Sequence, residues 1–304
     1  MPAILTQPQR FVLPSSGRLV NPACPVNWAH PLNAGRILWW SIVGNPGWRG
    51  SNVFHDLVRG AGHNPNDGTF QSIGSGSFPR WMGSLGQPGS IGCLKMTGTS
   101  TSVGAYVSCA NVSNIISSLS SISIAIWANL PASVSWNQSL VGMRNEIAPS
   151  NSDGPGAFYI NLLTSGVYET RFRNGSGTAV TVPNYSFNSG WKRLIATYDG
   201  TTLSLFVNGS LAVSAAASLG TFGQNGVPFS IGRTGGISSN NLQGMPSVSA
   251  TDAALWSRAL SAQDVALDYQ LSRQGYPNVL NYLGTTEYSF PTESNAGNFF
   301  LCMG

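Results

Sequence analysis

The sequence predicts an all-β protein, and three observations support this fold class. The 304-residue chain contains 36 glycines and only 9% charged residues, a composition that suits many short strands joined by tight turns. From residue 91 onwards, turn signals follow one another at short intervals, which favours a sandwich or a barrel. The clearest stretch, residues 191–214, holds three alternating runs separated by Asp199-Gly200 and Asn208-Gly209.

Period-two alternation within residues 191–214 predicts a three-stranded antiparallel meander with one apolar face. The Asn-Gly pair between two of these runs favours a type I′ turn, because both central residues of that turn need a positive φ. The residues expected on the apolar face are Leu194, Ala196, Tyr198, Leu203, Leu205, Val207, Leu211 and Val213. A second layer is expected to cover this face.

The whole chain is predicted to form one domain between two extended arms. Residues 1–35 contain six prolines, which block regular structure, and form the expected N-terminal arm. The domain spans residues 36–275: a leader strand over 36–43 and Gly-rich loops up to residue 90, then the core sandwich over 91–275. Residues 276–304 are polar with scattered aromatic residues, and they form the expected C-terminal arm.

One short helix is predicted over residues 262–273. Ser261 is the expected N-cap with Asp264 as its capping-box partner, and Gly275 and Pro277 are expected to end the helix. Four residues are expected to share one face of this helix: Ala262, Val265, Ala266 and Tyr269.

Several segments together resemble the laminin-G-like branch of the concanavalin A-like lectin/glucanase superfamily, over about residues 90–270. They are SISIAIWANL (121–130), SLVGMR (139–144), GAFYINLL (156–163), WKRLIATYDGTTLSLFVNGSLA (191–212), FSIGR (229–233) and DAALWSRALSAQDVALDY (252–269). The resemblance implies a two-sheet antiparallel jelly-roll sandwich, commonly a sugar- or protein-binding module. In addition, NWAHPLNAGRILWW (27–40) is similar to leaders that precede such domains in tailed-bacteriophage virion proteins, which implies a role in a virus particle.

Catalytic and metal chemistry are not indicated by the residues. A glycoside hydrolase needs two carboxylates flanking the bond, but the chain has four glutamates and no strand with alternating acids. Residues 96–106 lack the acidic pair that family members often use for calcium, so no cofactor is expected. Asp153 and Asp252 remain the two candidate ligands for a calcium ion, which prefers carboxylate oxygens. We therefore expect a protein that is not an enzyme.

Nucleic acid and membranes are not expected partners. The net charge is +4, but the basic residues are scattered rather than clustered as in phosphate-binding surfaces. No window has the apolar length of a membrane span, and the N-terminal residues do not read as a signal peptide. The four cysteines form no CxxC pair and are expected to be free thiols in a protein made in a reducing cytoplasm.

The candidate ligand-binding residues are Trp136, Asn151, Asp153 and Arg171. Trp136 stands in a polar loop, SVSWNQS, where an indole can stack on a sugar ring or pack against a protein partner. The alternative is that such aromatic residues pack against the sandwich itself.

The first hypothesis for function is a non-enzymatic virion structural protein, made in the host cytoplasm. A capsid decoration protein is the first choice, forming a homo-oligomer and contacting other virion proteins through its two arms. The alternatives are a tail or fibre adhesin, and a stand-alone module that binds host or environmental glycans.

Overall fold

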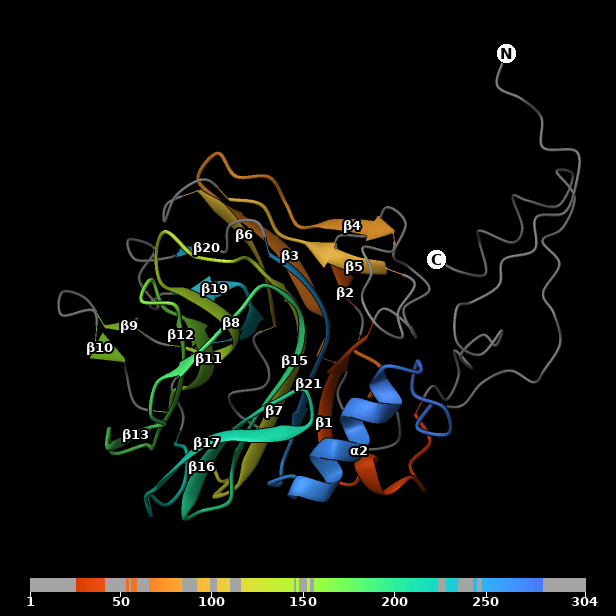
Figure 1. The fold of residues 1–304 in the computed structure, drawn as a ribbon, viewed down its shortest axis with the longest axis vertical. Helices are drawn as coiled ribbons and strands as arrows, with labels where there is room; N and C mark the ends of the chain where they lie inside the picture. Colours follow the sequence, from red (N-terminus) through yellow and green to blue (C-terminus); the bar gives the residue numbers. More distant parts are fainter. Residues whose placement is uncertain are drawn as a thin grey trace, which may run out of the picture.

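The computed structural model describes residues 26–41, 53–54, 56–58, 66–83, 92–98, 103–109, 116–144, 146–147, 152–153, 156–223, 228–234, 243–244 and 248–280. Within these residues two large antiparallel sheets pack face to face, with one short α-helix (Figure 1). The predicted all-β sandwich is therefore confirmed. Most of both predicted arms, residues 1–25 and 281–304, lies outside the described residues.

The first sheet has eight strands and contains the predicted meander. Its order is β17-β16-β15-β7-β21-β5-β4, and β1 also pairs with β21. The strands are β1 (Arg36–Trp40), β4 (Arg80–Gly83), β5 (Gly92–Lys95), β7 (Ile122–Leu130), β15 (Gly190–Tyr198), β16 (Thr202–Val207), β17 (Ser210–Ala216) and β21 (Ser249–Trp256). Asn208 and Gly209 have φ angles of 53° and 85°, so the positive φ values predicted for that turn are confirmed.

The second sheet has nine strands in the order β13-β12-β11-β8-β18-β6-β3-β2, with β14 beside β12. The strands are β2 (Val53–Phe54), β3 (Gly68–Ile73), β6 (Gly104–Cys109), β8 (Gln138–Met143), β11 (Phe158–Leu162), β12 (Val167–Arg173), β13 (Ala179–Thr181), β14 (Tyr185–Ser186) and β18 (Phe229–Ile231). Two short hairpins complete the strands: β9 (Glu146–Ile147) with β10 (Ser152–Asp153), and β19 (Arg233–Thr234) with β20 (Gln243–Gly244).

The main core lies between the two sheets and is made of apolar side chains from both. Phe172 of β12 stacks on Tyr198 of β15 with ring centroids 4.1 Å apart, so aromatic packing joins the sheets directly. Such pairs add stabilisation beyond the area they bury. The described cysteines Cys93 and Cys109 are buried thiols rather than disulfides.

The stretch predicted as Gly-rich loops, residues 44–90, contains the short strand β2 and also β3 and β4, two strands that the sequence did not predict. β3 pairs with β6, and β4 pairs with β5, so this stretch contributes to both sheets. The rings of Phe70 and Trp81 lie 5.3 Å apart and pack into the core. Pairing with distant strands outweighs the weak strand propensity of a Gly-rich sequence.

The predicted apolar face of the meander is confirmed except at Leu211. The register between β16 and β17 shifts between Leu205 and Phe206, where a β-bulge interrupts the pairing. Leu211 consequently lies opposite Phe206, on the other face of the sheet, and its side chain is 56% exposed. One extra residue in a strand reverses the side on which the following side chains point.

The predicted helix is present as α2 (Ala262–Ser272), with both hydrogen bonds of the capping box between Ser261 and Asp264. Its buried residues are Val265, Asp268 and Ser272, whereas Ala262 is exposed. The helix turns this face toward the sheet because Asp268 meets a buried arginine there. None of the described helices is long and apolar enough to cross a membrane.

A second apolar layer covers the outer face of the eight-stranded sheet. Ile195 and Phe206 of that sheet belong to one buried apolar cluster that also contains Val265 of α2, Leu32 and Val279. Leu32 belongs to the 3₁₀ turn η1 (Pro31–Asn33), so residues 26–35 of the predicted arm lie on the domain. Residues 276–280 pack there too rather than extending as an arm, because Tyr276, Val279 and Leu280 are buried. Figure 1 shows α2 beside β1 of the eight-stranded sheet.

Candidate functional site

A row of residues crosses the outer face of the nine-stranded sheet. Tyr159 of β11 lies between Gly142 of β8 and Arg171 of β12, and Arg171 lies opposite Thr181 of β13. On the other side, Gly142 lies opposite Ser230 of β18. Side chains alternate along a strand, so this row points away from the core that the neighbouring Phe158 and Phe172 help to fill.

Gly142 is required for the close approach of β8 and β11 in this row. Its φ is 134°, and a Cβ atom placed there would lie 2.2 Å from the carbonyl oxygen of Phe158. A residue with a side chain would push the strands apart. The glycine therefore sets the position of Tyr159 directly beside β8.

Asn161 and Glu169 form a second polar pair on the same face. Asn161 Nδ2 donates a hydrogen bond of 2.9 Å to Glu169 Oε2. Asn161 is fully buried, and its Oδ1 has no hydrogen-bond partner among the described residues. Glu169 is half-buried, so its carboxylate is held by Asn161 while remaining partly accessible to solvent.

Arginine side chains surround the row. Arg171 Nε donates to Thr181 Oγ1 at 2.9 Å, and Arg173 Nε donates to the carbonyl oxygen of Gly177 at 2.6 Å. The guanidinium carbon of Arg144 lies 5.2 Å from the centre of the buried Tyr159 ring, within cation–π range. β12 thus presents three half-buried charged residues on one face: Glu169, Arg171 and Arg173.

The predicted ligand-binding residues do not all lie together. Trp136 precedes β8, and Asp153 lies in β10, beyond the other end of β8, about 20 Å away along a strand of this length. Arg171 pairs with Tyr159, which is near the Asp153 end of the sheet. Asn151 lies outside the described residues.

Trp136 is half-buried, and its Nε1 is buried without a hydrogen-bond partner among the described residues. The neighbouring Asn137 Oδ1 accepts the backbone N–H of Thr164, which ties this loop to the turn between β11 and β12. Asp153 lies opposite Glu146 in the register of the β9–β10 hairpin. The roles assigned to these residues from the sequence stay predictions.

Sequence reasoning missed Tyr159, Asn161, Glu169 and Arg144. A signal was available in VYETRFR (167–173), whose alternation puts Glu169, Arg171 and Arg173 on one face. The pairing of Asn161 with Glu169 depends on the register between β11 and β12, which the sequence alone does not fix.

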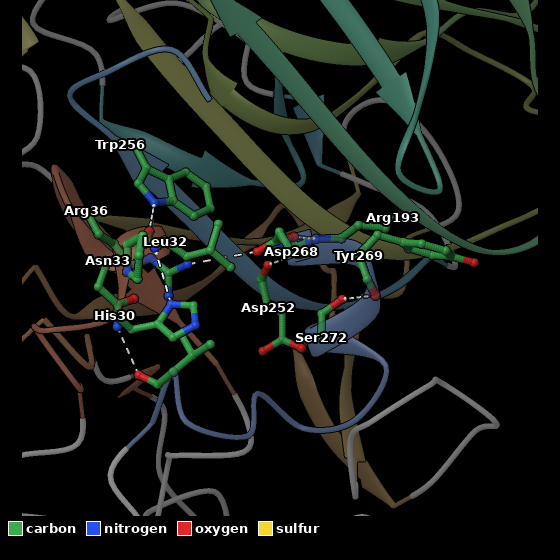
Figure 2. A network of polar contacts seen from close by, with 12 residues as sticks. His30, Leu32, Asn33, Arg36, Arg193, Asp252, Trp256, Asp268, Tyr269 and Ser272 are labelled. Atoms are coloured by element: carbon green, nitrogen blue, oxygen red, sulfur yellow. Dashed lines mark hydrogen bonds and ion pairs between the residues drawn. The ribbon is translucent and has the colours of Figure 1, made fainter. Parts of the chain in front are cut away.

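A different charged cluster lies beneath α2, on the other sheet (Figure 2). Arg193 Nε donates to Asp268 Oδ2 at 2.8 Å, and Arg193 Nη1 donates to the carbonyl oxygen of Asp252 at 2.7 Å. Arg36 Nη2 lies 3.9 Å from Asp268 Oδ1. Arg36 also packs against the indole rings of Trp39 and Trp256, at 3.9 Å and 4.6 Å from their centres.

Burial and the neighbouring charges act in opposite directions on the pKa values of this cluster. It lowers the pKa of Arg36 to about 10, against the opposing influence of Tyr276 and Asp268. Burial also lowers the pKa of Arg193, but Asp268 more than offsets this and raises the pKa above its ordinary value. Burial raises the pKa of Asp252 to about 6, although Arg193 acts in the opposite direction.

These buried charges fasten α2 to the sheet and are closed to a ligand from solvent, because all of them are at most 1% exposed. Asp252 lies near two arginines, which is unsuited to the calcium ion left open for it from the sequence. Among the described residues no group of three or more His, Cys, Asp or Glu side chains could hold a metal ion.

Comparison with solved structures finds the same fold in binding domains of botulinum neurotoxins. The binding domain of neurotoxin DC in a complex with SialylT has a TM-score of 0.52 and 12% identity, covering 80% of this chain and 52% of that chain. The DC binding domain in complex with rat synaptotagmin II has a TM-score of 0.51 and 12% identity, covering 79% and 52%. A type C structure, described as showing that cell entry depends on two ganglioside molecules, has a TM-score of 0.51 and 12% identity, covering 81% and 53%. This chain therefore spans about half the length of these neighbours.

Comparison with curated proteins finds no match. The family model named Laminin_G_3, of the concanavalin A-like lectin/glucanases superfamily, matches residues 100–266, more than half of the chain. The match includes β8, β11 and β12, the strands that carry the polar row. The two packed antiparallel sheets agree with that assignment, and the chain belongs to the concanavalin A-like lectin/glucanases superfamily.

Proposed function

We propose that this protein is a non-catalytic carbohydrate-binding module, whose ligand lies on the outer face of the nine-stranded sheet along β12. The observation that carries the proposal is the alignment of Glu169, Arg171 and Arg173 on one accessible face, beside the polar pair with Asn161. The outer face of the other sheet is covered by α2 and the apolar layer around it. The polar face along β12 thus offers a ligand charged groups on a rigid strand.

Sugar hydroxyl groups both donate and accept hydrogen bonds, so a sugar site needs donors and acceptors side by side. The carboxylate of Glu169 accepts, and the guanidinium groups of Arg171 and Arg173 donate. Existing hydrogen bonds to Thr181 and Gly177 hold the two arginines in place. Side chains that are positioned in advance lose less entropy on binding.

The same face argues against hydrolysis. Glu169 is the one acidic residue on β8, β11, β12 and β18, and glycoside hydrolysis requires a pair of carboxylates. Glu169 is also held by Asn161 rather than by a second acid. The site can bind a sugar without a general acid and base to cleave it.

The structural neighbours support a binding role for the fold in general. They are described as binding domains, and their descriptions name SialylT, gangliosides and synaptotagmin II as partners of those toxins. Because this chain matches about half of each neighbour, these partners are not transferred to it.

A glycan array probed with the purified chain tests the proposal. We expect binding to at least one glycan, weakened about 10-fold or more by Arg171→Ala and by Glu169→Gln, because each removes a hydrogen bond to a charged group. Ser214→Ala, on the other sheet, is the control and should bind normally. The proposal fails if no glycan binds, or if Trp136→Ala alone abolishes binding while the β12 variants keep it.

A role as a virion structural protein is the second candidate, as a capsid decoration protein or a tail or fibre adhesin made in the host cytoplasm. One observation favours it: Val26 and Leu280 form a β-bridge, and Asn27 Nδ2 donates to the carbonyl oxygen of Asn278 at 2.7 Å. The first and last described residues of the chain, Val26 and Leu280, therefore lie side by side on the domain. In this second proposal, the segments before Val26 and after Leu280 contact the same neighbouring virion subunit, within a homo-oligomer or with another protein.

Mass spectrometry of purified virions tests this second candidate. We expect the chain among the virion proteins, and we expect a variant without residues 1–25 to fold but to be lost from the particle. Absence of the full chain from purified particles would exclude the virion role, and it would leave the glycan proposal untouched.

A further inference from the structure

The strand β17 forms one edge of the eight-stranded sheet. It pairs with β16 on one side, and none of the described strands pairs with it on the other. Its exposed residues are Ser210, Leu211, Ser214 and Ala216. The backbone N–H and C=O groups on the open side of an edge strand are ready to pair with a strand of another chain. β17 is therefore a surface on which such pairing needs either a protecting feature or a partner.

The other edge strands carry protecting features. Proteins keep edges from pairing by making them short, covering them or placing charges on them. Among the described edge strands, β2 and β14 have two residues each, and β13 has three. β1 is buried along its whole length. β4 begins at the exposed Arg80, which lies opposite Lys95 of β5. β17, in contrast, is seven residues long and largely exposed.

The sequence around β17 carries no charge. No Lys, Arg, Asp or Glu occurs between Asp199 and Arg233, and β17 contains no proline. Two copies of β17 can approach each other without repulsion between like charges and without burying an unpaired charge. A second copy of the chain also brings the same open edge, so a single contact covers both edges at once. The chemistry of this edge therefore matches itself.

The regular part of β17 defines the length of the contact. Ala212 is left without a partner in the register of β17 against β16, and this is the position of the bulge. Residues 213–216 pair with β16 without interruption. Because a bulge disturbs a ladder only locally, these residues keep the regular strand geometry that a further strand needs. Ser214 lies in the middle of this segment, and its side chain is exposed.

Leu211 adds an apolar surface at the border of this segment. Its side chain is 56% exposed, although its cross-strand neighbour Phe206 belongs to the buried apolar cluster on the outer face of the sheet. A two-fold axis perpendicular to the sheet keeps the outer faces of both copies on the same side. The apolar outer faces of the two copies are then continuous across the paired strands.

We propose that β17 is a dimerisation edge, along which two copies of this chain pair in antiparallel orientation through residues 213–216. The contact is isologous, so it closes after two copies and does not build a filament. The two eight-stranded sheets then form one continuous sheet. This contact uses residues inside the domain, and it does not depend on the segments before Val26 and after Leu280.

Sedimentation equilibrium of the purified full chain over a range of concentrations tests the proposal. We expect a monomer–dimer equilibrium, weakened about 10-fold or more by Ser214→Lys, because two like charges then meet at the paired strands. Ser186→Lys, on the exposed edge strand β14 of the other sheet, is the matched control and should dimerise like the unmodified chain. A chain that is monomeric at every concentration would leave the edge to a strand of another protein and overturn the proposal. So would a dimer that Ser214→Lys leaves unchanged.

Charge exchange shows whether two copies of β17 meet each other. Ser214→Lys and Ser214→Glu should each dimerise weakly alone, and an equimolar mixture of the two should recover the dimer, because opposite charges then face each other. A mixture as weakly associated as the separate variants would count against pairing of β17 with itself.

Hydrogen–deuterium exchange of the unmodified chain decides the question even if the variants do not fold. The backbone amides of residues 213–216 should exchange about 10-fold more slowly at concentrations above the dissociation constant than far below it, because a second strand protects the open side. The amides of β13, an edge of the other sheet, should exchange equally at both concentrations. Equal exchange of residues 213–216 at both concentrations, or protection of β13 instead, would overturn the proposal.

Discussion

Asp56 and Asp252 are both buried aspartates, but different groups surround their carboxylates. Burial raises the pKa of each to about 6, but three backbone N–H groups act against this at Asp56. At Asp252 the opposing influence comes mainly from Arg193, with Ser41 and then Arg36 contributing less. The same residue type therefore serves as a loop organiser in one place and as a member of a charge cluster in the other.

The raised pKa of Asp252 predicts how stability depends on pH. The folded protein binds this proton more tightly than the unfolded chain, so ionisation of Asp252 opposes folding. As the pH falls from about 7 to about 4, the unmodified protein should gain stability relative to Asp252→Asn, by up to about 3 kcal/mol. Urea unfolding of both proteins at several pH values measures this difference. The groups facing Asp252 are Arg193, Ser41, Asp268, Arg36 and Tyr276.

Asp199→Asn is the control for this prediction, because its slope should have the opposite sign. Asp199 accepts hydrogen bonds from Thr201 and Thr202, which lower its pKa although slight burial acts the other way. Its contribution should be lost as the pH falls. The measured quantity is the difference in unfolding free energy between the unmodified protein and each variant as a function of pH. If this difference does not change with pH for Asp252→Asn, or changes in the same direction as for Asp199→Asn, the pKa assigned to Asp252 is contradicted.

At the scale of the strand, alternation predicts which residues face the core until a bulge changes the register. Leu205 and Leu211 occupy apolar positions of the same alternating pattern, yet Leu205 is fully buried and Leu211 is 56% exposed. The bulge between β16 and β17 places the two side chains on opposite faces of the sheet. No local signal in the sequence marks its position, because it depends on how the two strands pair.

This difference predicts unequal effects of the same substitution. Leu205→Ala should lower the free energy of unfolding by about 2–5 kcal/mol, because it leaves a cavity between the sheets. Leu211→Ala should change it by less than about 0.5 kcal/mol, as is usual for an exposed position. Urea unfolding at one pH compares the two variants. Equal losses would mean that the unbroken alternation predicted from the sequence is right and the bulge is wrong.

The turns and the helix cap can be predicted from the sequence more readily than the residue pairs of the candidate site. Asn208-Gly209 and the Ser261 capping box are set by residues close together in the chain, and both are confirmed. The pair of Asn161 with Glu169 depends on strand register. The pair of Arg193 with Asp268 joins residues 75 apart. Contacts of this kind are decided by tertiary packing, which local patterns do not contain.

On the scale of the whole molecule, the outer faces of the two sheets differ in how far they are covered. Arg193 of β15 and Arg171 of β12 both point outward from strands inside their sheets. Arg193 is fully buried under α2 and bonded to Asp268, whereas Arg171 is half-buried and bonded to Thr181. One face is closed by a helix and terminal segments, and the other carries the proposed ligand site.

The two arginines should therefore respond differently to the same replacement by methionine. Arg193→Met leaves Asp268 buried without its closest cation and should cost about 3–5 kcal/mol of unfolding free energy. Arg171→Met removes the hydrogen bond to Thr181 from a partly solvated position and should cost about 1 kcal/mol. The double variant should show the sum of both, because the two arginines lie in different sheets. Urea unfolding of the three variants measures these values. A loss at Arg171 as large as that at Arg193 would mean that β12 uses its charges to hold the fold together, and the outer face would then no longer be available to a ligand.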